Sequence, residues 1–265
     1  MNNLLKGKKG IIFGALDENS IAWKVALKAK EQGAEFILSN APVALRLGKI
    51  NELAELCNAE VIAADATNVE DLENLFDQAT AKYGKLDFVL HSIGMSPNVR
   101  KNKAYTELNY DWFLKTLDIS ALSFHKVLQV AYQKDALNEW SSVVALTYIA
   151  AQRTFPGYND MAEAKATLES IARSFGYHYG TKKNVRVNTI SQSPTMTTAG
   201  SGVKGFDVFY DYANKLSPLG NASSDSCADF TIALFSDLTK MVTMQNLFHD
   251  GGFSSIGMTE AFMEQ

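Results

Sequence analysis

Gly10-Ile-Ile-Phe13-Gly14-Ala-Leu-Asp-Glu-Asn-Ser20-Ile-Ala22 is the stretch of this sequence that decides the fold. Its apolar start predicts a buried β-strand, and Ser20 is a favourable N-cap residue for a helix that we expect over residues 20–32. Gly14 lets a ligand approach the backbone closely, and the start of the helix offers free N–H groups to an anion. A full dinucleotide-binding turn carries three glycines and this turn carries one, so a purely structural turn is an equally good interpretation.

Short apolar runs alternate with longer helical stretches along the rest of the chain. This alternation predicts βαβ units, and nearly continuous apolar runs are typical of central parallel strands. The sequence shows no internal repeat and no linker. We therefore expect an α/β fold, a doubly wound parallel sheet of Rossmann type, in a single domain over residues 1–265. Further strands are expected over 35–39, 60–64, 86–91, 142–147, 185–190 and 245–249, and further helices over 43–57, 69–83, 109–139 (two helices), 158–179 and 206–236.

Composition argues against several classes of protein and of site. The 265 residues are 46% hydrophobic and 20% charged, and the net charge of −4 argues against a nucleic-acid partner. No apolar run reaches the roughly 18–20 residues of a membrane span, and the start of the chain lacks a signal-peptide pattern. Cys57 and Cys227 lie far apart, which fits a reduced, cytoplasmic protein. The four histidines show no close ligand spacing, so we expect no metal site.

Several predicted strands end in residues suited to a dinucleotide, on the side where open parallel sheets bind ligands. Asp65 follows the third strand, where its carboxylate would accept a hydrogen bond from an adenine amino group; a helix-capping role is the alternative. Gly94 follows the fourth strand and allows backbone to pass close to a ligand. The second strand ends in Ser39-Asn40-Ala41-Pro42, without an acid for the ribose diol or a cation for a 2′-phosphate. The missing cation favours NADH over NADPH.

The sharpest chemical signal is the pair Tyr158 and Lys165, which follows the predicted fifth strand. On an α-helix, seven residues correspond to about 700° of rotation and roughly 10.5 Å of rise, so both side chains would project from nearly one face. A phenol and an ammonium on one face suit a single cofactor, with the lysine at the ribose hydroxyls and the tyrosine near a reacting carbonyl. The alternative is a helix-start aromatic and a solvated lysine.

Together these motifs resemble the short-chain dehydrogenase/reductase superfamily, and within it the enoyl-acyl-carrier-protein reductases of bacterial type II fatty acid synthesis. Ordinary superfamily members have Tyr-x3-Lys and a catalytic serine thirteen residues before the tyrosine. This chain has Ala145 at that position and Tyr-x6-Lys spacing, which is the pattern of the enoyl reductases. The motifs that carry the resemblance span about Lys8 to Met258 and are Gly14…Ser20-Ile-Ala22, His91-Ser-Ile-Gly94, Asp118-Ile-Ser120, Tyr148/Tyr158/Lys165, Arg186-Val-Asn188 and His249-Asp-Gly-Gly-Phe253.

The resemblance implies hydride transfer from NADH to C3 of a trans-2-enoyl thioester on acyl carrier protein, and commonly a homotetramer. Tyr158 would bind the thioester carbonyl oxygen and stabilise the enolate, Lys165 would hold the nicotinamide ribose, and Tyr148 would line the acyl pocket and assist in positioning or proton delivery. The substrate-binding residues that it implies are Met95, Ser96, Tyr148 and Tyr158. The cofactor-binding residues that it implies are Gly14, Ser20, Ile21, Asp65, Ala66, Ser92, Ile93, Gly94, Lys165, Thr195, Met196, Thr197, Thr198 and Ala199.

A substrate-binding loop is implied at about 192–215, with an ordinary Ser/Thr-rich connection as the alternative. The family usually has isoleucine where this chain has Thr195, and many relatives have glutamine at the site of Ala41. These departures put the apolar contact of the loop and the adenine-ribose contacts in doubt. The aromatic residues that follow either wall an acyl tunnel or form a helix core; they are Phe206, Phe209, Tyr210 and Tyr212.

Two other functions stay open. A carbonyl reductase or alcohol dehydrogenase of the same superfamily would share the fold, but Ala145 stands where such an enzyme has serine. A non-catalytic, dinucleotide-sensing protein would bind the cofactor without turnover, but it would not need both Tyr158 and Lys165.

Overall fold

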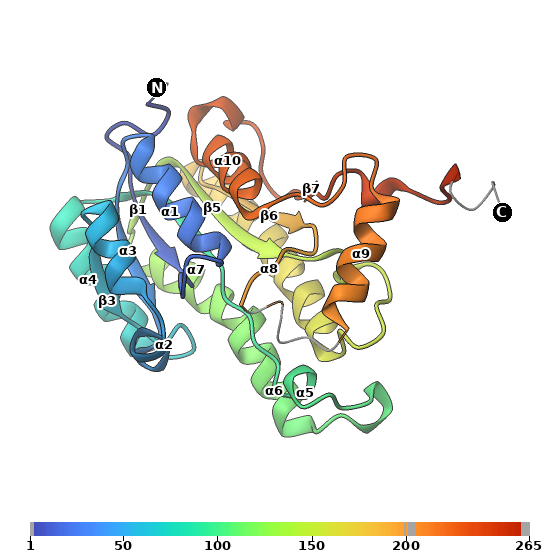
Figure 1. Cartoon of the computed structure of the whole chain (residues 1–265). Helices are drawn as coiled ribbons and strands as arrows, with labels where there is room; N and C mark the ends of the chain where they lie inside the picture. Colours follow the sequence, from blue (N-terminus) through green and yellow to red (C-terminus); the bar gives the residue numbers. More distant parts are fainter. Residues whose placement is uncertain (1–2, 199, 201–204, 261–265) are drawn as a thin grey trace.

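A seven-stranded parallel sheet forms the centre of the structure, a computed structural model that describes residues 3–198, 200 and 205–260 (Figure 1). The strand order is β3-β2-β1-β4-β5-β6-β7, and each neighbouring pair is parallel. This order confirms the predicted doubly wound α/β class. The strands are β1 (Lys9–Phe13), β2 (Glu35–Asn40), β3 (Glu60–Ala63), β4 (Leu86–His91), β5 (Leu137–Thr147), β6 (Arg186–Gln192) and β7 (Asn246–His249).

Helices cover both faces of the sheet. One apolar cluster joins the sheet to α4, α7 and α8, and a second joins it to α1, α3 and α10. None of the described helices is long and apolar enough to cross a membrane. The helices are α1 (Ile21–Glu31), α2 (Pro42–Leu47), α3 (Ile50–Cys57), α4 (Val69–Tyr83), α5 (Pro97–Arg100), α6 (Tyr110–Leu117), α7 (Ser123–Gln133), α8 (Asp160–Lys183), α9 (Phe206–Leu216) and α10 (Ser224–Phe235).

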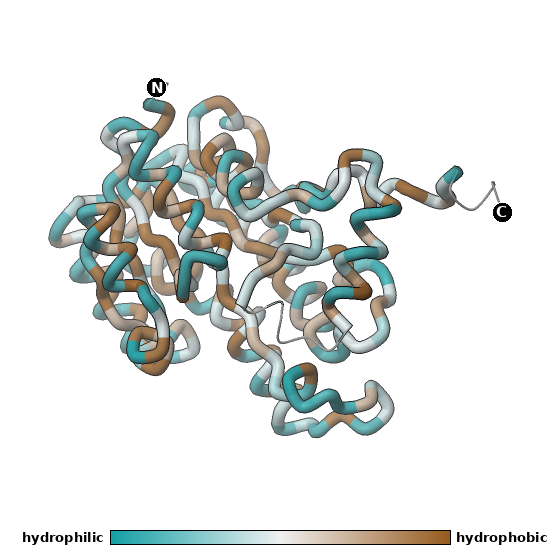
Figure 2. Tube along the Cα trace, viewed as in Figure 1, coloured by the Kyte–Doolittle hydropathy of each residue, from teal (hydrophilic) through white to brown (hydrophobic). Residues whose placement is uncertain are grey.

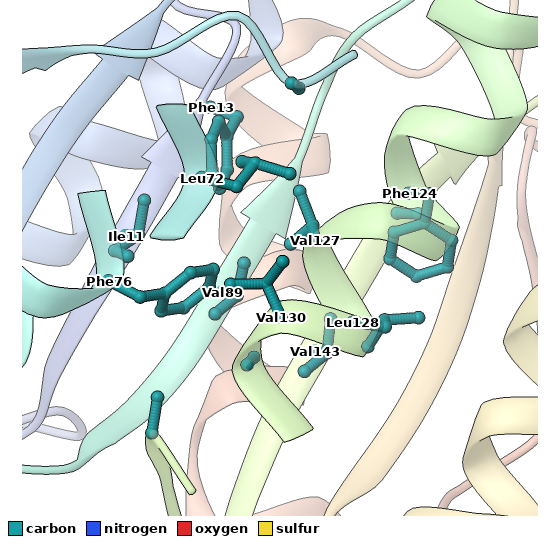
Figure 3. Packing of buried hydrophobic residues seen from close by; sticks show 14 of the residues in the cluster. Ile11, Phe13, Leu72, Phe76, Val89, Phe124, Val127, Leu128, Val130 and Val143 are labelled. Carbon is teal, nitrogen blue, oxygen red and sulfur yellow. The ribbon is translucent and has the colours of Figure 1, made fainter. Parts of the chain in front are cut away.

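The central strands are buried on both faces, which explains their nearly continuous apolar sequences, whereas the edge strands β3 and β7 are partly exposed. Side chains alternate along β1, so that Ile11 and Phe13 belong to the cluster with α4 and α7, and Ile12 belongs to the other. Figure 3 shows Phe76 of α4 and Val127 of α7 packed over Val89 of β4. Figure 2 shows the same pattern along the chain, with hydrophobic residues concentrated on the central strands. Each large side chain buried here contributes about 1.5–3 kcal/mol relative to an exposed one.

The helix predicted over 43–57 is divided in two. Gly48 has an extended backbone (ψ −177°) between α2 and α3, and a Cβ at this position would lie 2.5 Å from Leu16 O. The next residue, Lys49, donates its N–H to the same carbonyl at 2.7 Å. The break therefore lets the second βα connection dock against the turn that follows β1, a tertiary contact that helical periodicity does not predict.

The helix predicted over 158–179 begins two residues later than expected, at Asp160, and continues to Lys183. Asn159 has a positive φ of 47°, and its Nδ2 donates to Lys103 O at 2.7 Å. Tyr158 consequently precedes the helix that carries Lys165. The prediction that both residues lie along one helical face is wrong in its premise, because helical spacing does not apply to Tyr158.

Candidate active site

The turn after β1 lies where the strand order reverses, between β1 and β4, which is the usual ligand crevice of such sheets. Gly14 has φ +93°, and a Cβ there would lie only 2.0 Å from Ser92 O at the end of β4. Glycine is therefore required both by its backbone conformation and by the close approach of the two strand ends. The structure brings these two predicted cofactor residues together.

The N-terminus of α1 is open to an anion. Ser20 occupies the predicted N-cap position, but its Oγ donates to Asp17 O at 2.6 Å and accepts from Leu16 N at 3.2 Å instead of capping the helix. The first turn contains no acidic residue. Trp23 N donates to Ser20 O at 3.1 Å, and the N–H groups of Ile21 and Ala22, which have no partner among the described residues, are left for an external anion such as a pyrophosphate. This arrangement fits the dinucleotide that the sequence predicts.

Asp65 does not cap α4, whose N-cap is Asn68. Its Oδ1 accepts hydrogen bonds from Thr67 N at 2.9 Å and Thr67 Oγ1 at 2.7 Å, so the carboxylate organises the turn before α4. Its Oδ2 has no hydrogen-bond partner among the residues that the structure describes. The side chain is half-buried and its neighbour Ala66 is buried. A contact with an adenine amino group therefore stays a prediction.

Lys165 lies within the protein interior, with 7% of its surface exposed. Its Nζ donates to Leu146 O, near the end of β5, at 2.8 Å. A Cβ placed on Gly94 would lie 3.7 Å from this nitrogen, so the end of β4 passes beside the ammonium. Burial lowers the pKa of Lys165 from 10.5 to about 8, and the charge of Glu169 opposes that shift. An ammonium has three donors, so two are left for ribose hydroxyls.

Tyr148 and Tyr158 are in ring contact, with centroids 5.1 Å apart and planes inclined by 53°. Burial raises the pKa of both phenols well above the ordinary value, and for Tyr148 the neighbouring Tyr158 and Asp250 add to the shift. Both phenols are therefore protonated near neutral pH. Neither hydroxyl has a hydrogen-bond partner within the part of the chain that the structure describes. The pair offers neutral O–H donors to a substrate oxygen.

An aromatic cluster extends from this pair towards α9. Phe155 stands 5.3 Å from Tyr148 and 5.9 Å from Phe209, and Phe253 stands 6.2 Å from Phe155 and 6.0 Å from Tyr212. Ala213 is the only residue among the described part of α9 that is buried. A helix with this little burial is not a core helix, so the acyl-pocket wall stays the prediction for Phe209 and Tyr212. Phe206 and Tyr210 contact one another, with centroids 6.3 Å apart.

Met95 and Ser96, the predicted substrate residues, follow β4 and are fixed through different atoms. Met95 N donates to Ser120 Oγ at 2.9 Å, and that hydroxyl donates back to Met95 O at 3.1 Å. Ser96 Oγ donates to the buried Asp160 at 2.6 Å and accepts from Val99 N at 3.0 Å. The Ser96 hydroxyl is therefore committed to the protein, and a substrate contact there falls to the backbone.

The predicted substrate loop is tied to the turn after β1. Thr198 Oγ1 donates to Asp17 Oδ2 at 2.6 Å. Thr195 Oγ1 donates to Ser193 O at 2.8 Å, and Thr197 Oγ1 accepts from Gly200 N at 2.9 Å, so both hydroxyls stabilise the loop itself. Met196 is exposed. Ala199 lies outside the described residues.

Residues 14–254 match the protein family described as Enoyl-(Acyl carrier protein) reductase. The chain belongs to this family. Enoyl-acyl-carrier-protein reductase (NADH) 2 of Rhizobium meliloti (strain 1021) is 33% identical over 261 residues, covering 97% of this chain and 96% of that protein. The FabI–NADH complex from Alistipes finegoldii is 66% identical, with a TM-score of 0.96 over 97% of this chain and 92% of that one. The reductase from Aquifex aeolicus VF5 is 28% identical, with a TM-score of 0.89 over 97% and 100%.

In this enoyl-(acyl carrier protein) reductase, sequence reasoning missed several residues that shape the site. Ser120 lies in a π-helical turn between α6 and α7, a feature common near functional sites. Asp160 and Glu169 are buried carboxylates on α8. Phe253 belongs to a quoted motif, but its contact with the aromatic cluster depends on tertiary structure. Ser120 also belongs to a quoted motif, and the signal for Glu169 was its spacing of one helical turn from Lys165.

Proposed function

We propose that this chain reduces the trans-2 double bond of enoyl thioesters on acyl carrier protein, with NADH as hydride donor, in fatty acid elongation. The observation that carries the proposal is the pair of neutral phenols, Tyr148 and Tyr158, beside an aromatic wall and near the end of β5, where the buried Lys165 is anchored. The matched family and the NADH-dependent relatives agree with it.

The residues around the switch point suit a bound dinucleotide. The open N-terminus of α1 and the close approach of Gly14 to Ser92 would hold the pyrophosphate, with Ile21 contributing its N–H. The other predicted contacts are Asp65 and Ala66 at the adenine, Ser92, Ile93 and Gly94 at the middle of the cofactor, Lys165 at the nicotinamide ribose, and Thr195, Met196, Thr197, Thr198 and Ala199 from the loop. The nicotinamide supplies a hydride, and the protein orients it and excludes water.

Tyr158 stabilises the charge that the reaction creates. Hydride addition at C3 of the enoyl thioester moves negative charge to the carbonyl oxygen, where a neutral phenol donor acts as oxyanion stabiliser. The raised pKa of Tyr158 keeps its proton in place for this hydrogen bond. Lys165 places a positive charge in the same region, which favours the enolate. Tyr148 lines the acyl pocket together with Phe155 and positions the thioester.

The end of β2 supports NADH over NADPH. Asn40 uses its side chain internally, with Nδ2 donating to Ala15 O at 3.1 Å and Oδ1 accepting from Ala41 N at 2.9 Å. Two cations follow on the chain, Arg46 within α2 and Lys49 just after it, and Lys49 is paired with Glu18 at 2.9 Å. The end of the strand itself therefore offers no charge to a 2′-phosphate.

The decisive experiment is an assay of purified protein with crotonyl thioester on acyl carrier protein, run with NADH and NADPH side by side. We expect loss of NADH absorbance and formation of the butyryl thioester, with NADPH far slower. A folded protein that oxidises neither cofactor with any enoyl thioester would refute the proposal. Ketone reduction in a parallel screen would instead support a carbonyl reductase, against which Ala145 argues. NADH binding without turnover would support a sensing protein.

We also propose that the protein assembles as a homotetramer in the cytoplasm. β7 is an edge strand of the sheet, with Phe248 exposed on it, and edge strands invite pairing or cover. Tyr110 and Leu114 expose large apolar surface on α6, and Tyr177 does so on α8. Two separate apolar faces suit the two kinds of interface of a tetramer with dihedral symmetry. Light scattering after gel filtration tests this; a monomer mass at micromolar concentration would contradict it. The proposed location in the cytoplasm rests on the cysteines. Cys57 and Cys227 are free and buried, which fits a reducing compartment.

A further inference from the structure

Glu169 is a buried acceptor hub on α8, one helical turn after Lys165. Only 4% of its surface is exposed. Its Oε1 accepts from Thr147 Oγ1 at 2.9 Å and from Asn246 Nδ2 at 3.2 Å, and its Oε2 accepts from Gln152 Nε2 at 3.1 Å. The carboxylate thus joins α8 to the end of β5, to the segment after Tyr148 and to β7.

Each of these hydrogen-bond donors is neutral. Within the described residues, Glu169 forms no ion pair with a lysine, arginine or histidine at contact distance. A buried carboxylate normally needs a compensating charge, because neutral donors offset only part of the cost of leaving water. The nearest candidate on its own helix is the buried Lys165, since residues four apart on a helix have Cβ atoms about 5–6 Å apart.

The two charges are anchored to consecutive residues of β5. Lys165 Nζ donates to Leu146 O, and Thr147 Oγ1 donates to Glu169. The strand therefore holds the ammonium and the carboxylate in neighbouring positions without direct contact. This separation leaves the lysine donors free for a ligand, whereas a direct salt bridge would occupy them.

We infer that Glu169 is a positioning residue for cofactor binding, whose negative charge keeps Lys165 protonated around neutral pH and so keeps an ammonium available to the ribose. This inference rests on the proposed function for the role of Lys165. Glu169 touches neither the cofactor nor the substrate; it acts through the lysine.

The other titratable groups near Lys165 do not replace Glu169. His91 at the end of β4 is fully buried, and burial, followed by the charge of Lys165, lowers its pKa to about 3, so it is neutral. Its Nε2 is 2.8 Å from Ser123 Oγ, a hydroxyl that donates to Ile119 O. The phenols of Tyr148 and Tyr158 are neutral as well. Burial lowers the pKa of Lys165 to about 8, and Glu169 is the charge that opposes this effect.

Glu169→Gln removes the charge and preserves the hydrogen bonds. The amide oxygen can still accept from Thr147 and Asn246, and Gln152 can turn its amide to accept from the new NH2 group. A nearby opposite charge shifts a pKa by about 1–3 units, and because the two groups are not in direct contact we expect the lower end, so the variant should lose the lysine proton about one pH unit lower. Half of Lys165 is protonated near pH 8 in the parent. In the variant about a tenth of Lys165 would be protonated at pH 8, and NADH affinity would fall about fivefold at that pH.

The experiment measures the dissociation constant of NADH by fluorescence at pH 6 and pH 8, without turnover. For Glu169→Gln we expect about fivefold weaker binding at pH 8 and less than twofold at pH 6. Thr147→Val, the matched control, removes a hydrogen bond and keeps the charge, so its effect should be the same at both pH values. If Glu169→Gln weakened NADH binding equally at pH 6 and pH 8, or at neither, the inference would be overturned. A parent protein that fails to bind NADH would refute the proposed function instead.

A second measurement covers the case in which Glu169→Gln folds poorly. The second measurement is the Tm of the cofactor-free protein at pH 6. Glu169→Gln should lower the Tm of the parent protein, because the substitution leaves a buried ammonium without its countercharge. The same substitution in a Lys165→Met background should leave the Tm unchanged or raise it, because it then removes an uncompensated buried carboxylate. An equal decrease in both backgrounds would contradict the inference. Glu169→Asp retains the charge and should retain the pH dependence of NADH binding.

Discussion

Replacing Tyr158 with phenylalanine removes one hydroxyl and leaves its ring in place against Tyr148, 5.1 Å away. The hydroxyl has no partner among the described residues, so its loss breaks no hydrogen bond within that part of the protein. We therefore expect stability to change little. In the proposed reaction the same hydroxyl would face a developing oxyanion, and removal of one such donor costs about 2.7–4 kcal/mol, or roughly 100- to 1,000-fold in kcat. The wide gap between these two effects makes the substitution diagnostic.

The assay follows NADH oxidation with crotonyl thioester under saturating cofactor, alongside the dissociation constant of NADH. We expect kcat to fall about 100-fold or more and NADH affinity to stay within about twofold. Tyr179→Phe is the matched control on α8: Tyr179 is a buried phenol whose Oη donates to Leu128 O at 2.9 Å. Its loss should lower stability by about 0.5–1.5 kcal/mol and leave kcat unchanged. If Tyr158→Phe kept the parent kcat with every enoyl chain tested, Tyr158 is not the oxyanion donor.

Substitutions at three positions give further predictions. Lys165→Met should weaken NADH binding at pH 7, because it removes the ammonium. In the parent protein, NADH affinity should fall as the pH rises through about 8, where Lys165 loses its proton. The pKa of Lys165 in the folded protein lies below the ordinary value of 10.5, so the unfolded chain binds more protons between about pH 8 and pH 10.5. The stability of the cofactor-free parent relative to Lys165→Met should therefore rise with pH across that window, as measured by denaturation at several pH values. Gly14→Ala should cost on the order of 1–3 kcal/mol in backbone strain and abolish NADH binding, because its Cβ overlaps Ser92 O; unaltered NADH titration would contradict this. Asp160→Asn should lower stability by about 1–3 kcal/mol and raise the KM for the enoyl thioester more than the Kd for NADH, because its NH2 group must replace either the oxygen that accepts from Ser96 or the oxygen that accepts from Asn98 and Thr116. Equal changes in both constants would count against it.

The sequence predicts the strands, the turn after β1 and the start of α1, which depend on residues close together in the chain. Apolar runs alternating with helical stretches were sufficient to predict the strands and a parallel sheet, because buried parallel strands have little polar sequence. Gly14 and Ser20 marked the turn and the start of α1 correctly, since backbone conformation and helix capping depend on a few adjacent residues. The side chain of Ser20, however, bonds within the turn, a detail that no spacing rule contains.

The errors occur where tertiary contacts override periodicity. Helical spacing placed Tyr158 on the same helix as Lys165, but the positive φ of Asn159 interrupts the backbone between them. The Asn159 side chain bonds to Lys103 O, a residue more than fifty positions away, and this contact is invisible in local sequence. Gly48 divides the predicted helix over 43–57 for the same kind of reason, a contact with Leu16. The position of Tyr158 thus depends on a loop and not on a helical ridge.

The two buried carboxylates of α8 hold the site in place through contacts that local sequence patterns do not predict. Asp160 follows Tyr158 by two residues and accepts from Ser96, Asn98 and Thr116 at 2.6–2.8 Å. Glu169 follows Lys165 by one turn and likewise accepts from three neutral side chains. Each ties the helix to elements distant in the chain. Aspartate and glutamate are almost never fully buried unless partnered, so sequence patterns assign them to the surface. Because an acceptor hub fixes a helix through hydrogen bonds from several elements at once, we expect substitutions at both positions to alter the site more than the loss of any one donor.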